Sequence, residues 1–81
     1  MNSNKQNLIN KIIYRSQYRG TKEMDIFLSS FVKSIVDSLS IDDLKDLDLL
    51  VNMNDEDISK ISKNEISFEN KKILKLLIDF K

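Results

Sequence analysis

Apolar residues recur along the chain at the spacing of a single helix face, in five successive stretches. Residues three, four and seven positions apart lie on the same side of a helix, so each stretch predicts an amphipathic helix. The second stretch is the longest, and we expect it to be the spine of the core. Its apolar residues are Met24, Phe27, Leu28, Phe31, Ile35 and Leu39. The predicted helices cover residues 4–18, 21–38, 41–52 and 55–62, followed by a last one that starts after Ser67.

Small polar residues separate these stretches and suit helix starts. Each later stretch is preceded by a residue whose side-chain oxygen can cap a helix N-terminus. These residues are Thr21, Ser40, Asn54 and Ser67. Gly20 is the single glycine of the chain. Because only glycine adopts positive φ without steric cost, we expect Gly20 to turn the chain after the first helix.

The chain contains no proline, whereas β-rich domains of this size normally need several prolines and glycines in their turns. The predicted fold class is therefore all-α: a compact five-helix bundle that forms a single domain over residues 1–81. Residues 1–5 and Lys81 are expected to be frayed. The N-terminus is polar and no long apolar run occurs, so we expect neither a secretory leader nor membrane insertion. The expected location is the cytoplasm of a bacterium.

The residue types exclude most catalytic chemistry. The chain has no cysteine and no histidine, so it lacks a thiol nucleophile, the commonest general base and the commonest metal ligands. The acids of the third predicted helix do not have the spacing of a calcium-binding loop, and a solvated helix face is the better interpretation. These acids are Asp42, Asp43, Asp46 and Asp48. We therefore predict that the protein is not an enzyme.

Charge is balanced in total but unevenly distributed. Residues 1–23 carry five basic side chains and one acid, whereas residues 37–57 carry eight acids and one lysine. Residues 58–81 are basic again, with six lysines and three acids. Such segregation can orient a charged partner. Equally, oppositely charged segments can face each other within the fold.

The junction between the first two predicted helices gathers the residue types that dominate protein interfaces. Arginine and tyrosine are enriched at interface hot spots, and a glycine allows close approach of a partner's backbone. The candidate partner-binding residues are Arg15, Tyr18, Arg19, Gly20 and Glu23. Structural roles are the alternative, and the spacing alone favours them. Gly20 can be a helix cap, and Glu23 can complement a helix dipole or pair with Arg19.

A nucleic-acid interface is a second alternative. Basic and aromatic side chains near one helix end can contact phosphates and stack on bases. Those side chains are Lys11, Arg15, Tyr18, Arg19 and Lys22. However, the chain is not basic in total, and its acidic middle segment would repel phosphate. We therefore rank nucleic acid below a protein partner.

The same junction carries a family resemblance. The segment Arg19-Gly20-x-x-Glu23 follows Ile13-Tyr14-Arg15-Ser16 and precedes Met24-Asp25-x-x-Leu28. It resembles the RGxxE signature of the small FAD assembly factors of succinate dehydrogenase, the SdhE type. The resemblance extends from about Leu8 to Phe80, and that family is a five-helix bundle. One departure is Ile61, where relatives often have a tryptophan.

The resemblance implies an assembly factor, or chaperone, that docks through the RGxxE motif on the flavoprotein subunit of succinate dehydrogenase. It would promote flavinylation, the covalent attachment of FAD to that subunit, without binding FAD stably itself. The fumarate reductase flavoprotein is a further candidate client, and a monomer is expected. The alternatives are a helical nucleic-acid-binding module and a regulatory protein-binding module with another client.

Overall fold

A computed structural model describes residues 3–80 of the chain. The elements in this range are α1 (Ser3–Arg15), α2 (Lys22–Ile35), the short 3-10 helix η1 (Val36–Ser38), α3 (Ile41–Val51), α4 (Asp55–Ser62) and α5 (Lys71–Asp79). No strand occurs among these residues. The prediction of an all-α bundle of five helices in one domain is therefore confirmed.

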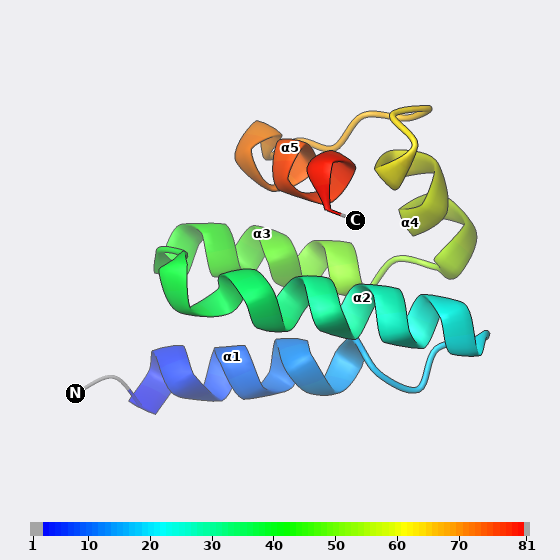
Figure 1. Cartoon of the computed structure of the whole chain (residues 1–81). Coiled ribbons are helices and arrows are strands. Elements are labelled where there is room, and N and C mark those ends of the chain that lie inside the picture. The colour runs from blue at the N-terminus through cyan, green and yellow to red at the C-terminus, as the bar shows by residue number, and fades with distance from the viewer. Residues whose placement is uncertain (1–2, 81) are drawn as a thin grey trace.

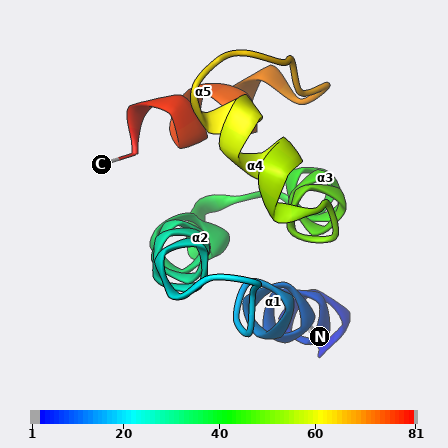
Figure 2. The same ribbon diagram turned by 90° about the vertical axis from the view of Figure 1, so that its right-hand side faces the viewer.

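The first three helices form the base of the bundle. They lie side by side and run alternately in opposite directions, so the α1–α2 and α3–α4 connections meet at the same end (Figure 1). Seen along their axes, α1, α2 and α3 form a triangle, and α4 and α5 lie above α2 and α3 (Figure 2). This arrangement brings together two connections that are more than thirty residues apart in sequence.

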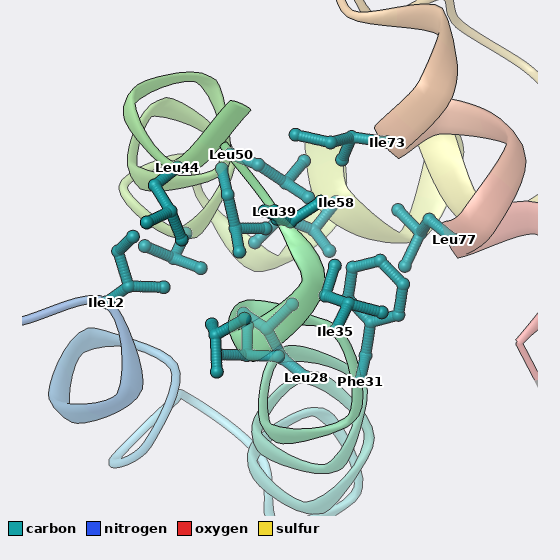
Figure 3. Packing of buried hydrophobic residues seen from close by; sticks show 14 of the residues in the cluster. Ile12, Leu28, Phe31, Ile35, Leu39, Leu44, Leu50, Ile58, Ile73 and Leu77 are labelled. Atoms are coloured by element: carbon teal, nitrogen blue, oxygen red, sulfur yellow. The ribbon is translucent and has the colours of Figure 1, made fainter. Parts of the chain in front are cut away.

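The core lies between these layers. Leu28 and Phe31 of α2 are completely buried, as expected for the central helix. Side chains from α1, α3, α4 and α5 converge on them (Figure 3). Phe31 also packs edge-on against Phe80, with ring centroids 5.4 Å apart, a favourable aromatic geometry. Ile61 of α4 is buried in the same cluster, so the position that often holds a tryptophan in the resembled family is a core position here.

Three of the four predicted helix caps are present. The side chains of Thr21, Ser40 and Asn54 each accept a hydrogen bond from the backbone N–H three residues later. Each bond satisfies one of the N–H groups that a helix start leaves without an intrahelical partner. The start positions of α2, α3 and α4 consequently agree with the predicted ones within one residue.

The prediction that Ser67 caps the last helix is wrong. The cap is Asn70, whose side-chain oxygen accepts from the N–H of Ile73 at 3.1 Å. Its amide nitrogen also donates to Asp43 and Asp46 of α3, at 3.0 and 2.8 Å. Asn70 therefore both caps α5 and attaches it to α3. The second of these roles depends on tertiary contacts, which the local sequence does not reveal. Phe68 lies in the preceding connection and is buried there.

Oppositely charged segments do face each other within the fold. Ion pairs join the basic N- and C-terminal segments to the acidic middle segment. The pairs between residues far apart in sequence are Lys11–Asp48 at 3.3 Å, Arg19–Asp55 at 2.9 Å and Lys72–Asp43 at 3.2 Å. Part of the uneven charge distribution is therefore neutralised internally.

The predicted fraying falls partly on Met1, Asn2 and Lys81, which lie outside the described residues. Ser3 already belongs to α1. None of the helices between residues 3 and 80 is both long and apolar enough to cross a membrane.

The contact between α3 and α5 predicts an acid-sensitive contribution to stability. Hydrogen bonding by Asn70, followed by Lys72, lowers the pKa of Asp43 from its usual range. A lowered folded-state pKa means that the stabilisation is present above the unfolded carboxyl pKa of about 3.9 and is lost as the pH falls through the folded value. We expect Asp43→Asn to be less stable than wild type at pH 7, with the difference shrinking below about pH 4.

Chemical denaturation at a series of pH values measures this difference. The matched control is Asp42→Asn, because Asp42 is an exposed acid in the same first helical turn. It shares the helix-dipole contribution but lies outside the Asn70 contact. Equal pH profiles for the two variants would contradict the role given to Asp43.

Candidate functional site

The first helix ends three residues earlier than predicted, at Arg15. The buried Ser16 closes it, because its N–H donates to the carbonyl of Ile12 at 3.0 Å and its hydroxyl donates to that of Ile13 at 2.6 Å. Tyr18 then adopts the left-handed region with φ of 58°, which is uncommon for a residue other than glycine. The chain is therefore turned by Tyr18, and the expectation of positive φ at Gly20 is wrong.

Arg19 follows this turn and points into the protein. Its side chain is only 13% exposed. The guanidinium donates from Nη1 to the carbonyl oxygens of Arg15 and Val51, at 3.0 and 2.7 Å. These are the last residues of α1 and α3, whose carbonyls have no partner within their own helices. A cation at this place also complements the C-terminal dipoles of both helices.

The remaining contacts of Arg19 extend to the start of α4. Nη2 donates to the carbonyl of Met53 at 2.6 Å, and Nε donates to Oδ1 of Asp55 at 2.9 Å. The other carboxylate oxygen, Oδ2, accepts from the backbone N–H of Gly20 at 2.9 Å. Arg19 thus connects three helix ends through four hydrogen bonds. We call this set of contacts the Arg19 lock: Arg15 carbonyl, Val51 carbonyl, Met53 carbonyl, Asp55 carboxylate and Gly20 N–H.

The lock decides between the alternatives that the sequence left open for Arg19 and Glu23. Arg19 pairs with Asp55 and not with Glu23, which is exposed in the first turn of α2. A guanidinium has five N–H donors, and four hydrogen bonds within the protein use most of them. Arg19 is therefore not free to hold a partner's carboxylate with its planar fork.

Exposed side chains surround the lock. Tyr14 and Tyr18 are 66% and 77% exposed, and their rings pack against each other with centroids 5.7 Å apart. Arg15 is exposed beside them and donates to the side chain of Asn52 in the α3–α4 connection. An open groove of about 370 Å³ runs between the two connections. We call this region the tyrosine surface: Tyr14, Arg15, Tyr18 and Asn52.

Glu23 lies on a different groove. This second groove, of about 260 Å³, is formed by the start of α2 and by α4. Its lining residues are Thr21, Glu23, Met24, Phe27, Ser59 and Ser62. Three of the five candidate residues, Arg15, Tyr18 and Arg19, therefore line the first groove. Gly20 directly follows them and contacts Asp55, and Glu23 lies on the second groove.

Metal and nucleic-acid sites gain no support from this geometry. Between residues 3 and 80, no three acidic side chains gather in a way that could hold a metal ion. Of the basic side chains considered for nucleic acid, Lys11 and Arg19 form ion pairs with Asp48 and Asp55. Phosphate binding would compete with these internal acids.

Sequence reasoning missed Asp55 as a member of the site. An acid in the first turn of a helix after an asparagine cap has a sufficient local explanation in the helix dipole. Its partner Arg19 lies 36 positions earlier, and no local pattern links the two. The backbone carbonyls of Val51 and Met53 carry no sequence signal at all.

The fold and this site define a small helical bundle with an Arg-Gly-x-x-Glu junction locked to the start of its fourth helix. Residues 10–81 match the family described as the flavinator of succinate dehydrogenase. The chain belongs to this family, and the resemblance carried by the RGxxE motif is confirmed.

A curated relative agrees with this assignment. Over 57 residues the chain is 35% identical to a protein of Arabidopsis thaliana named succinate dehydrogenase assembly factor 2, mitochondrial. The aligned segment is 70% of this chain but only 30% of that protein, so the chain spans about a third of the relative's length. No solved structure matches the chain.

The four hydrogen bonds of the partly buried Arg19 side chain predict a large effect on stability. Arg19→Ala leaves three carbonyls and a partly buried carboxylate without their charged donor, so we expect a loss of about 2–4 kcal/mol in the free energy of unfolding. Arg15→Ala is the matched control, because this exposed arginine of the same junction makes one side-chain contact with Asn52. Its loss should be below about 1 kcal/mol. Urea denaturation measures both, and equal small losses would contradict the lock.

Proposed function

We propose that this protein is an assembly factor that binds the flavoprotein subunit of succinate dehydrogenase and promotes covalent attachment of FAD to it. The observation that carries the proposal is the family match over residues 10–81, which includes Arg19, Gly20 and Glu23. The name of the Arabidopsis relative supports the same role. The FAD and the histidine to which it is attached belong to the flavoprotein, so the helper needs no reacting group of its own.

The tyrosine surface is the proposed docking site, with Glu23 as a second contact at its neighbouring groove. Exposed tyrosine and arginine side chains are typical interface anchors because they bury much area with few rotatable bonds. Tyr18 supports this choice further. A tyrosine at positive φ costs of order 1 kcal/mol, and such strain is often retained at functional sites. In this proposal Arg19 and Gly20 act by holding the surface in shape.

The proposed mechanism is alignment by binding. The factor binds the FAD-loaded, unfinished flavoprotein and prefers the arrangement in which flavin and histidine can react. A binder shifts such an equilibrium only by its difference in affinity for the two arrangements. Correct alignment can lower a barrier by several kcal/mol without the helper supplying a catalytic group. The factor must then dissociate, so a transient interface is expected.

Related flavoproteins extend the proposal. The fumarate reductase flavoprotein carries out similar chemistry and remains a candidate client. A monomeric state and a bacterial cytoplasmic location also remain predictions. Analytical ultracentrifugation of the free protein and of its mixture with the flavoprotein separates a monomeric helper from a constitutive oligomer.

The test compares wild type with Tyr18→Asn and Glu23→Gln in a flavin-attachment assay. Asparagine tolerates positive φ, so Tyr18→Asn removes the ring while keeping the backbone. Each variant is added to the flavoprotein with FAD, and covalent flavin is read as fluorescence after denaturing electrophoresis. Loss of a central anchor weakens binding by about 2 kcal/mol or more, roughly thirtyfold in the half-saturating concentration. Melting temperatures should change little because both side chains are exposed.

The control is Ile41→Ala. Ile41 is also an exposed apolar residue, 41% accessible, but it begins α3 at the opposite end of an eleven-residue helix. That helix is about 16 Å long, so the control leaves the docking end intact. Full activity of both test variants would refute the docking site. No stimulation by the wild type would refute the function itself.

A further inference from the structure

The carboxylate of Asp55 holds two adjacent residues of the α1–α2 connection. Oδ1 accepts from Nε of Arg19 and Oδ2 accepts from the N–H of Gly20, both at 2.9 Å. Asp55 is the first residue of α4, and Asn54 caps that helix. The carboxylate therefore extends from the capped start of α4, and both of its oxygens accept hydrogen bonds from the α1–α2 connection.

The backbone conformation of residue 20 does not itself require a glycine. Its φ is not positive, and the residue is exposed. However, a Cβ at this position would lie 2.9 Å from Oδ2 of Asp55, closer than Cβ atoms are found in proteins. Oδ2 is the end of a side chain and can shift, but the same carboxylate holds Nε of Arg19, so a shift would disturb that bond. The close approach of Asp55 is thus a sufficient physical cause for a glycine.

From this geometry we infer that Asp55 is a positioning residue of the docking surface, and that residue 20 is a glycine in order to admit its carboxylate. The inference rests on the proposed function and adds to it a residue from a distant part of the sequence. Asp55 acts through Arg19 and Gly20: it fixes the connection that carries Tyr18. It makes no contact with the client itself.

Asp55→Asn is the first test, because the variant keeps the size of the side chain. An asparagine has one acceptor oxygen, and its NH₂ group is a donor, which cannot accept a hydrogen bond from the other of the two N–H groups. Either Arg19 or Gly20 consequently loses its partner. We expect the half-saturating concentration in the flavin-attachment assay to rise about tenfold or more, since the surface must be reordered on binding.

The assay is run at a temperature where circular dichroism shows each variant to be more than about nine-tenths folded, because two-state unfolding then removes little active protein. The matched control is Ile73→Val, a mild core change in α5 away from the junction. It should lower the denaturation midpoint while leaving the half-saturating concentration unchanged. If Asp55→Asn behaves like Ile73→Val, Asp55 is structural only and the inference is overturned.

A double-mutant cycle tests the reason for Gly20 without any client. In the wild type, Gly20→Ala forces a methyl group against Asp55 and should lower the urea midpoint. In the Asp55→Ala background the obstruction is gone, and alanine restricts the unfolded chain more than glycine does. There the same change should leave the midpoint equal or raise it. Equal decreases in both backgrounds would overturn the inference.

The two readouts separate this inference from the proposed function. Wild-type protein that fails to stimulate flavin attachment overturns the proposed function, together with the docking role of Asp55. The stability cycle then still decides whether Asp55 explains the glycine. If wild-type protein stimulates flavin attachment but the effects of Gly20→Ala and Asp55→Ala on stability are additive, the assignment of Asp55 is overturned and the proposed function stands.

Discussion

The partly buried guanidinium of Arg19 organises the geometry of one end of this bundle. Helix packing brings the C-terminal ends of α1 and α3 together, and each end leaves carbonyl groups without intrahelical partners. One planar cation satisfies carbonyls from both, and its carboxylate partner is the first residue of α4. A lysine could supply the charge but not this fixed set of donor directions. The side chain of Arg19 therefore connects the start of α4 directly to the end of α1.

This lock changes how the RGxxE motif is understood in this chain. Two of its defining residues, Arg19 and Gly20, face Asp55, whereas Glu23 faces solvent. A substitution at Arg19 would therefore disturb both folding and the tyrosine surface, and loss of function alone would not identify a direct contact. The exposed residues Tyr18 and Glu23 are the positions at which binding and stability can be separated.

Much of the fold could be predicted because it depends on local rules. Helical periodicity located five helices, and the side chains of Thr21, Ser40 and Asn54 marked three starts. The errors have tertiary causes. Asn70 replaced Ser67 as a cap because Asp43 and Asp46 of α3 engage its amide group.

The candidate site was predictable in part for the same reason. The sequence indicated the junction and its tyrosine, but it gave no indication that the Arg19 side chain points into the protein and is only 13% exposed. Besides the nearby carbonyl of Arg15, its partners are the carbonyls of Val51 and Met53, at and just after the end of α3, and an acid 36 residues away. The sequence suggested that Gly20 is a turn residue. The carboxylate that approaches it belongs to Asp55, and an acid in the first turn of a helix is already explained by the helix dipole.

Nuclear magnetic resonance of the guanidinium groups tests the central claim, that Arg19 acts inside the protein, most directly. The chain contains only two arginines, Arg15 and Arg19, so an Arg15→Lys variant assigns both. The lock predicts that the Arg19 Nε–H exchanges slowly with water near neutral pH and that its Nη protons give separate signals, because four hydrogen bonds hinder rotation. The Nε–H of the exposed Arg15 should exchange fast with water, and its Nη protons should give one averaged signal. Fast exchange and averaged signals for Arg19 as well would contradict the account.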